Sequence, residues 1–291
     1  MQTELVQATT SDGIPLDGAF FAAEGLPSEK RGLDAVLLVH GSGGNFYSNL
    51  LLTIAQGLRQ AAYPSVSFNT TGHDLVWGAP GRFMGNAHEI LDRCRLDIKA
   101  GIDWLEGRGY KRIGIFGHSM GAVKVVYYQA TERDPRVAAV ISSSPVRLSH
   151  SFFLTTEGAD EHWRNIDRAQ SLINEGRPDD VFPVSFPMPH LFSARSYLDK
   201  HGPDERYNLM KYVKDVLCPL LIMAGSLEDN PRLRNCAIDM HELVKDRAEA
   251  SLVIQQGADH GYTGMLDRLA DNVVSWIAKL QPVEAQVSAN D

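Results

Sequence analysis

Eight short apolar runs constrain the fold more strongly than any other feature of this chain. They read LVQAT, LDGAFFA, DAVLLVHG, SVSFNT, RIGIFG, VAAVISSS, PLLIMAG and SLVIQQG. From the third run onward most are continuous rather than alternating, which is typical of strands buried on both faces of a parallel sheet. Helical patterns fill the gaps, and this alternation predicts an α/β fold with right-handed crossovers. The first two runs alternate better and are joined by a turn at Asp12-Gly13, so we expect an antiparallel edge.

The clearest helical pattern is NAHEILDRCRLDIKAGIDWLEGRG. Its apolar side chains recur at steps of three and four residues: Leu91, Cys94, Ile98, Ile102 and Leu105. This spacing predicts one buried helix face, and it places Cys94 in the core. Asn86 followed by Glu89 fits a capping box at the start of the helix.

One long segment, from Val146 to Cys218, interrupts the alternation. It carries the helical pattern DEHWRNIDRAQSLINEG and then a stretch rich in proline and in aromatic residues (Phe182, Phe186, Phe192 and Tyr197). A structureless loop of this length is improbable in a compact domain, and the aromatic groups favour the lining of a site over a solvated embellishment. We therefore predict a core domain from 1–145 and 218–284, an inserted helical or irregular cap at 146–217 and a frayed tail at 285–291.

Composition and charge exclude several classes of partner. The formal net charge is −8 with no cluster of lysine and arginine, which argues against nucleic-acid binding. No apolar run reaches the roughly 18 residues of a membrane span, and the first residues lack the pattern of a secretory signal. Three scattered cysteines indicate reduced thiols, so we expect a cytoplasmic location. The sequence leaves a homodimer open.

A serine between two glycines marks the candidate catalytic centre. Gly117-His118-Ser119-Met120-Gly121 lies where an apolar run ends and a helical pattern begins. Such a motif also arises by chance in tight turns, but at a strand-to-helix junction it predicts a nucleophile elbow. The glycines leave room for the turn, and the start of the next helix offers N–H groups to a developing oxyanion.

A nucleophilic serine needs a base, and the base needs an acid. His260 follows the last strand-like run, and its loop is expected to reach the same edge of the sheet. Glu228 and Asp229 both follow the preceding run, so either could be the acid. His118 is expected to pack beside the serine and to border the substrate.

The glycine-rich stretch Gly41-Ser42-Gly43-Gly44 is the expected second part of an oxyanion hole. Glycine lets the backbone approach a ligand closely, so we expect Gly41 and Gly43 to border the substrate. The backbone N–H groups of Ser42 and Met120 are the expected donors. No Lys-Ser/Thr pair follows the glycines, as a phosphate-binding loop would require, and no H-E-x-x-H spacing indicates a metal site.

Together these motifs resemble those of the α/β-hydrolase-fold serine hydrolases. The resemblance rests on LLVHGSGGN, FNTTGHD, GHSMGA, MAGSLED and GADHGY, which occur in family order over nearly the whole chain. It implies an eight-stranded, mostly parallel sheet, a cap inserted after the sixth strand and no cofactor. It also implies Ser119 as nucleophile and His260 as base. In the family the acid usually follows a glycine by three residues, which favours Glu228, whereas the frequency of aspartate favours Asp229.

Ester hydrolysis through an acyl-enzyme is the leading functional hypothesis, on a small to medium, partly apolar substrate. An amide, thioester or lactone would use the same groups. One alternative is hydrolysis of a carbon–carbon bond in a diketone or dienone acid, which needs a cationic anchor for the substrate carboxylate. Arg147, at the root of the predicted cap, is the candidate anchor. A second alternative is a ligand-binding protein that does not turn its ligand over.

Overall fold

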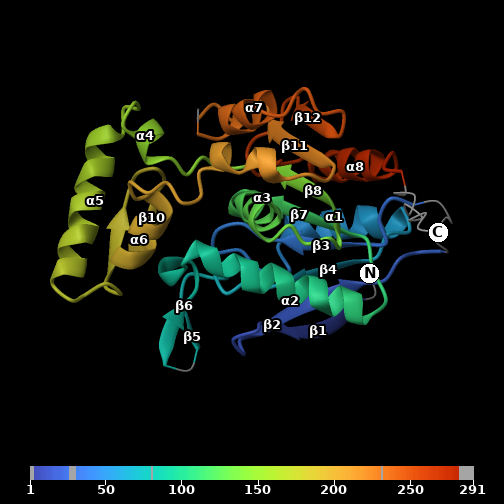
Figure 1. The fold of residues 1–291 in the computed structure, drawn as a ribbon, viewed down its shortest axis with the longest axis horizontal. Coiled ribbons are helices and arrows are strands. Elements are labelled where there is room, and N and C mark those ends of the chain that lie inside the picture. Colours follow the sequence, from blue (N-terminus) through green and yellow to red (C-terminus); the bar gives the residue numbers. More distant parts are fainter. Residues whose placement is uncertain (1–2, 26–30, 80, 231, 282–291) are drawn as a thin grey trace, which may run out of the picture.

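An eight-stranded sheet forms the centre of the molecule (Figure 1). The structure, a computed structural model, describes residues 3–25, 31–79, 81–230 and 232–281. In the sheet the strands follow the order β1-β2-β4-β3-β7-β8-β11-β12. Their bounds are β1 Glu4–Thr9, β2 Pro15–Phe21, β3 Ala35–Val39, β4 Ser65–Phe68, β7 Ile113–His118, β8 Val137–Ser143, β11 Leu220–Gly225 and β12 Ala250–Gln255. Each of the eight apolar runs of the sequence is one of these strands.

The strand directions confirm the predicted antiparallel edge. β1 pairs with β2 antiparallel, with Glu4 opposite Phe20 and Thr9 opposite Pro15. β2 also runs antiparallel to β4, and every pair from β4 to β12 is parallel. The sheet is therefore mostly parallel, and the carboxyl ends of β3, β7, β11 and β12 lie at one edge.

Helices cover both faces of the sheet, as strands buried on two sides require. α1 (Asn49–Gln60) and α8 (Leu266–Ile277) pack together on one face. α2 (Cys94–Gly107), α3 (Met120–Glu132) and α7 (Arg234–Glu242) cover the other. Two separate apolar cores result, one on each side of the strands. A small hairpin of β5 (Trp77–Ala79) and β6 (Arg82–Met84) lies outside the sheet.

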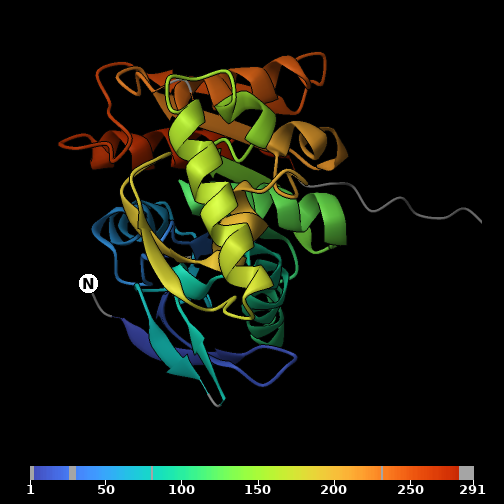
Figure 2. The same cartoon turned by 90° about the vertical axis from the view of Figure 1, so that its left-hand side faces the viewer.

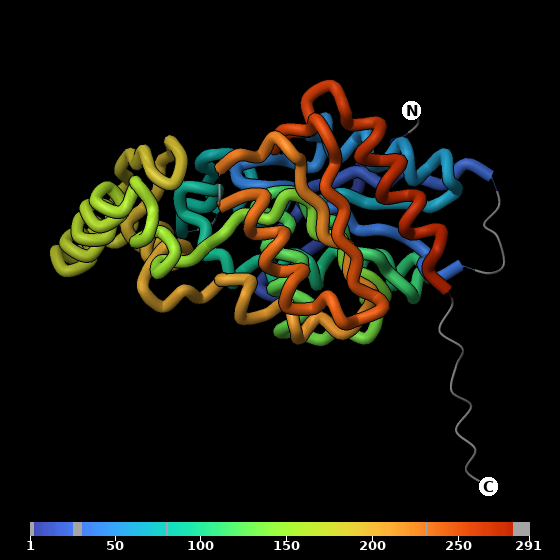
Figure 3. The backbone as a smooth tube through the Cα atoms, turned by 90° about the horizontal axis from the view of Figure 1, so that it is seen from above, coloured from blue at the N-terminus to red at the C-terminus, as the bar shows by residue number. Residues whose placement is uncertain are grey.

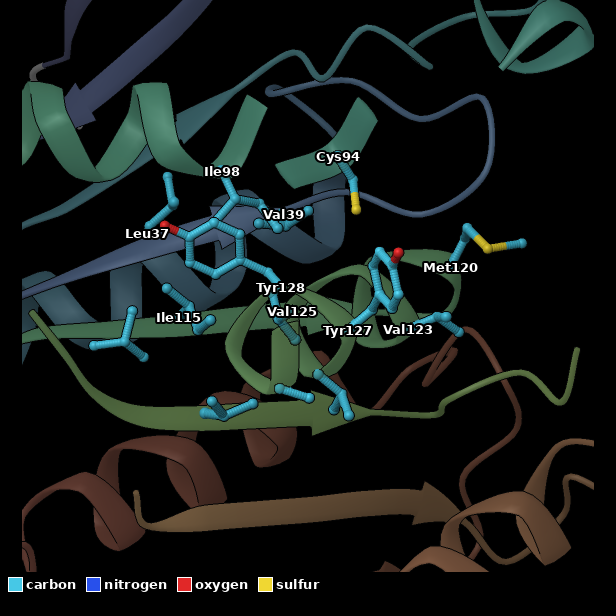
Figure 4. Packing of buried hydrophobic residues seen from close by; sticks show 14 of the residues in the cluster. Leu37, Val39, Cys94, Ile98, Ile115, Met120, Val123, Val125, Tyr127 and Tyr128 are labelled. Atoms are coloured by element: carbon cyan, nitrogen blue, oxygen red, sulfur yellow. The ribbon is translucent and has the colours of Figure 1, made fainter. Parts of the chain in front are cut away.

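Figure 4 shows how α2 and α3 close the first of these cores over the strands. Ile98 of α2 lies beside Tyr128 of α3, and Cys94 of α2 faces Tyr127. Leu37 and Ile115 come from the strands beneath. Cys94 is 3% exposed, and burial raises the pKa of its thiol. The structure therefore confirms that Cys94 is a core residue, and a buried thiol of this kind is a poor nucleophile.

The predicted capping box at the start of α2 is wrong. Residues Asn86–His88 and Leu91–Arg93 form two short 3₁₀ turns, and the α-helix begins only at Cys94. Glu89 does not return to an N-cap backbone, because its carboxylate is buried in ion pairs with two lysines. The polar pattern that resembled a cap is part of a tertiary contact.

The long segment after the sixth sheet strand contains helices and a hairpin. Its elements are α4 (His150–Phe153), α5 (Ala159–Asn174), β9 (Val181–Val184), β10 (His190–Ser193), α6 (Ala194–His201) and the 3₁₀ turns Leu209–Lys211 and Val213–Asp215. The front view and the view from above agree that α5 and the β9–β10 hairpin lie beyond one edge of the sheet (Figures 1 and 3). Figure 2 shows α5 in front of that edge.

This inserted segment has an apolar core of its own. Phe182, Phe192 and Tyr197 pack with Ile166 and Ala169 of α5. The aromatic side chains that were expected to line a site therefore serve in part to hold α5, the hairpin and α6 together.

The exact division into core at 1–145 and 218–284 and cap at 146–217 stays a prediction, and the predicted tail at 285–291 lies outside the described residues. No helix in the described ranges is long and apolar enough to cross a membrane.

A buried ion triad joins the inserted segment to the core. Glu89 Oε1 lies 2.6 Å from Lys124 Nζ on α3, and Glu89 Oε2 lies 2.7 Å from Lys200 Nζ on α6. Both lysine side chains are fully buried. A Cβ at Gly72 would lie 1.9 Å from Glu89 Oε1, so only glycine permits this approach. Burial raises the pKa of Glu89, but the two lysines outweigh burial and lower it to about 2.

We expect Glu89→Gln to lower the free energy of unfolding by about 3–5 kcal/mol at pH 7, because it leaves two buried ammonium groups without a counter-charge. The carboxylate stabilises the fold fully above its ordinary pKa of 4.5, and this contribution is lost as the pH falls toward 2. Urea unfolding at pH 7 and pH 3 should therefore show a deficit that shrinks at pH 3.

Glu132→Gln is the matched control, because Glu132 pairs with Arg95 and both side chains are about one third exposed. We expect its loss to stay within about 0.5 kcal/mol. Equal losses for the two variants, or a Glu89→Gln deficit that does not depend on pH, would contradict the stabilising role of the triad.

Candidate active site

Ser119 occupies a strained turn between β7 and α3. Its φ of 58° and ψ of −120° lie in a region that non-glycine residues seldom adopt. The glycines on either side explain how the turn fits. A Cβ on Gly117 would lie 2.1 Å from the Gly121 carbonyl oxygen, and a Cβ on Gly121 would lie 2.3 Å from the Val39 carbonyl oxygen. The two glycines therefore allow β3, β7 and α3 to approach closely enough to present the serine.

A continuous chain of hydrogen bonds runs from Ser119 to a buried carboxylate. His260 Nε2 lies 3.0 Å from Ser119 Oγ, and His260 Nδ1 lies 2.9 Å from Glu228 Oε2. The three residues follow β7, β11 and β12, so parallel strands bring them to one edge of the sheet. With Nδ1–H donated to the carboxylate, Nε2 is free to accept the serine proton.

The Glu228 carboxylate is well supplied with donors. Ser144 Oγ and the backbone N–H of Gly225 both donate to Oε1, each at 2.6 Å. Burial raises the pKa of this carboxyl, but hydrogen bonds from His260, Ser144 and Gly225 outweigh burial and hold it below its ordinary value. The Tyr262 hydroxyl lies 3.0 Å from Ser144 Oγ and donates to it, because the single Ser144 proton goes to Glu228. The sequence did not predict a site role for Ser144 or Tyr262. Ser144 ends the run VAAVISSS, and Tyr262 ends the motif GADHGY.

The structure separates the two candidate acids. Asp229 has a side chain that is 86% exposed, and its ion-pair partner is Arg234 at 3.9 Å. Glu228, by contrast, is fully buried against His260. Glu228 follows Gly225 by three residues. The three-residue spacing after a glycine therefore agrees with the geometry, and the family's more frequent use of aspartate does not.

The loop after β3 lies against Ser119. A Cβ on Gly41 would lie 3.1 Å from Ser119 Cβ and 3.6 Å from its Oγ, so a larger residue here would press on the serine. His40 braces the loop. Its Nε2 accepts from the Thr70 N–H at 2.9 Å, which leaves Nδ1–H to donate to the Gly41 carbonyl at 2.8 Å. Burial, together with the charge of Lys124, lowers the pKa of His40 to about 3, so the ring is neutral at pH 7.

The two expected oxyanion donors, Ser42 N–H and Met120 N–H, have no acceptor among the described residues. Both residues line the same cavity as Ser119. Gly43 does not line this cavity. Its φ of 58° and its approach to Asp74 and Asn86 make it a turn residue of the loop.

A cavity of about 500 Å³ contains the serine, the histidine and the glycine loop. The inserted segment supplies its other wall, from Pro187, Met188, His190, Phe192 and His201. A cavity of about 660 Å³ next to the β5–β6 hairpin holds none of the expected site residues. The smaller cavity is therefore the candidate active site.

Of two further predicted residues, His118 lies as expected and Arg147 does not. His118 lines the cavity, and its Nε2 contacts the His260 carbonyl oxygen at 2.8 Å, so it fixes the backbone of the candidate base. Burial and the neighbouring His260 lower the pKa of His118 to about 4, which makes it neutral at pH 7. Arg147 does not line the cavity. Its guanidinium pairs with Asp239 and stacks on Phe152, which corrects its expected role as an anchor.

Residues 36–275 match the model of the alpha/beta hydrolase family. The chain therefore belongs to this family, and it is a hydrolase. No curated protein sequence matches it at a significant level.

Several solved structures share the fold over nearly their whole length. The alpha/beta hydrolase GrgF from Penicillium sp. sh18 aligns with a TM-score of 0.70 and 16% identity, over 97% of this chain and 99% of that chain. Est1E from Butyrivibrio proteoclasticus gives 0.65 and 16%, over 94% and 97%. The Pyrococcus furiosus esterase Pf2001 gives 0.61 and 19%, over 95% and 91%. At these identities the similarity shows the fold alone.

The close packing around the serine turn generates a stability prediction. Gly117→Ala should lower the free energy of unfolding by about 1–3 kcal/mol, because the new methyl group overlaps the backbone at Gly121. Gly107→Ala, at the end of α2 with no atom within 4 Å of the new Cβ, should instead raise it by about 0.5–1 kcal/mol. Urea unfolding measures both, and a neutral Gly117→Ala would contradict the packing argument.

Proposed function

We propose that this chain hydrolyses carboxylic esters through a covalent acyl-enzyme on Ser119. The observation that carries the proposal is the unbroken hydrogen-bonded chain from Ser119 through His260 to the buried Glu228. A serine hydroxyl is a weak nucleophile until a base accepts its proton, and a base is effective only when a third group orients it. The three side chains have the contacts that these roles require.

The proposed reaction has two halves. Ser119 Oγ attacks the ester carbonyl carbon while His260 Nε2 takes the hydroxyl proton, and the N–H groups of Ser42 and Met120 stabilise the oxyanion. His260 then gives its proton to the departing alcohol, which leaves an acyl group on Ser119. A water molecule, deprotonated by His260, then attacks the acyl carbon, and His260 returns the proton to Ser119 Oγ as the acid leaves. Glu228 holds the imidazole and stabilises its charged form throughout.

The cavity supports a small to medium substrate. Its volume of about 500 Å³ is within the range of small-molecule sites, and its lining is more apolar than polar. Two of the structural neighbours, Pf2001 and the esterase domain from Rhodothermus marinus, are named as esterases. These names support an ester in preference to an amide or thioester as the first substrate to test.

Carbon–carbon bond hydrolysis of a diketone or dienone acid is the second candidate. Its expected anchor, Arg147, is paired with Asp239 outside the cavity, so this reaction would need another cation to hold the substrate carboxylate. The other expectations from the sequence stay predictions. They are a cytoplasmic location, a small-molecule acyl partner without nucleic acid or membrane, an open question of dimerisation, and chemistry without a cofactor.

A fluorophosphonate probe tests the nucleophile directly. The wild-type protein should gain the mass of one phosphonyl group at neutral pH, because an activated serine displaces fluoride from phosphorus, and Ser119→Ala should gain none. Intact mass spectrometry reads both. Labelling of Ser119→Ala at the wild-type rate, or no labelling of a folded wild type, would overturn the assignment.

Glu228→Gln and Asp229→Asn separate the acid from its neighbour. Glu228→Gln should lower kcat for a p-nitrophenyl ester by about 10⁴, because the imidazole loses both its orientation and its counter-charge. Asp229→Asn should leave kcat within about twofold, since an exposed carboxylate contributes little to the fold. Equal losses in the two variants would remove Glu228 from the proposed mechanism.

A further inference from the structure

Arg232 lines the candidate active site, although nothing in the sequence indicated that it would lie there. Arg232 lies between β11 and α7, four residues after Glu228, and is only 7% exposed. It lines the cavity that contains Ser119 and His260. It also lines a neighbouring cavity of about 660 Å³ that Phe152, Phe153 and Phe186 border. Arg232 therefore lies where the two cavities meet.

The Arg232 guanidinium has almost no partners of its own. Nη1 donates to the Pro187 carbonyl oxygen at 3.2 Å. Nε is buried without an acceptor, and no carboxylate of the described residues lies within ion-pair distance of the guanidinium. The contrast with Arg147 is direct, because that arginine, whose backbone N–H donates to the Arg232 carbonyl oxygen, has Asp239 as its counter-charge. A buried cation without a counter-charge is costly to the fold, so an anion that reaches Arg232 is favoured there.

The surroundings of Arg232 leave its charge uncompensated. Burial lowers its pKa to about 10, so the guanidinium is still charged at neutral pH. Two histidines line the same cavity, and each has a ring nitrogen without a partner in the described structure: His190 Nε2 and His201 Nδ1. Burial lowers the pKa of both rings, which keeps them neutral. Arg232 is thus the one lysine or arginine among the described residues of the cavity lining, and the two unpaired histidine nitrogens are themselves buried.

We propose that Arg232 binds a free carboxylate of the substrate, so that the chain prefers esters that also carry a carboxylic acid. The proposal rests on the proposed function, because it assumes that Ser119 cleaves an ester in the same cavity. A carboxylate that enters the cavity supplies the missing counter-charge and accepts charge-assisted hydrogen bonds from the guanidinium. A neutral ester of equal length leaves the guanidinium without a counter-charge.

Pairs of esters that differ only in charge test this preference. Mono-p-nitrophenyl adipate and suberate are compared with the same esters whose free acid is capped as a methyl ester. The wild type should show a kcat/KM at least about tenfold higher for the acid of each pair, as expected for a hydrogen bond to a charged group in a buried site. Equal or lower values for both acids would overturn the proposal without any variant.

Two variants assign the preference to Arg232. In Arg232→Gln the ratio of kcat/KM between acid and capped ester should fall to about one or below, because the charge is gone. Arg164→Gln removes the same charge from α5, where the side chain is 67% exposed, and should keep the wild-type ratio. A wild-type ratio in Arg232→Gln would overturn the proposal. If Arg232→Gln does not fold, Arg232→Lys replaces it, and a ratio below that of the wild type but above one is expected.

Fluorophosphonate labelling of the same samples separates this inference from the proposed function. A wild type that is labelled on Ser119 but does not prefer the acids overturns the role of Arg232 alone. A folded wild type that is not labelled overturns the proposed nucleophile.

Discussion

The approach of β7 and α3 is the constraint on which the rest of the site depends. At Gly117 and Gly121 the neighbouring backbones lie so close that an added methyl group would overlap them. The serine between the two glycines has a positive φ, which is unfavourable for a residue other than glycine. The packed sheet holds this turn in place, and the Ser119 N–H donates to the Ser143 carbonyl of the next strand. The strained serine is thus a product of the fold around it and does not require a special local sequence beyond the two glycines.

Parallel strands explain why so few residues are needed to build the rest. Their carboxyl ends meet at one edge, so the loops that carry Ser119, Glu228 and His260 converge without long excursions. Around them lies a layer of supporting groups that are neutral at pH 7. His40 and His118 hold backbone carbonyls of the glycine loop and of the base, and burial keeps both rings uncharged. This arrangement leaves the Glu228 carboxylate as the charge nearest to the imidazole.

The sequence predicted the strands and the candidate nucleophile and base, because apolar runs, glycine spacing and chain order are local signals. The offset from Gly225 also indicated Glu228. Long-range contacts were not predictable in this way. The Asn86–Glu89 pattern has the form of a cap, but Lys124 and Lys200 bind the carboxylate from elements far along the chain. Likewise Arg147 and Arg232 look alike in sequence, and only the fold shows that one has a carboxylate beside it.

The ion triad at Glu89 also limits the movement of α6 relative to the core. Lys124 belongs to the helix that begins at the nucleophile, and Lys200 belongs to α6 in the inserted segment. Moving α6 outward would take Lys200 away from Glu89 and leave that buried carboxylate with Lys124 alone, which is costly. This helix therefore acts as a fixed wall and not as a hinged lid. Entry of the substrate and release of the product then do not depend on an outward movement of that wall.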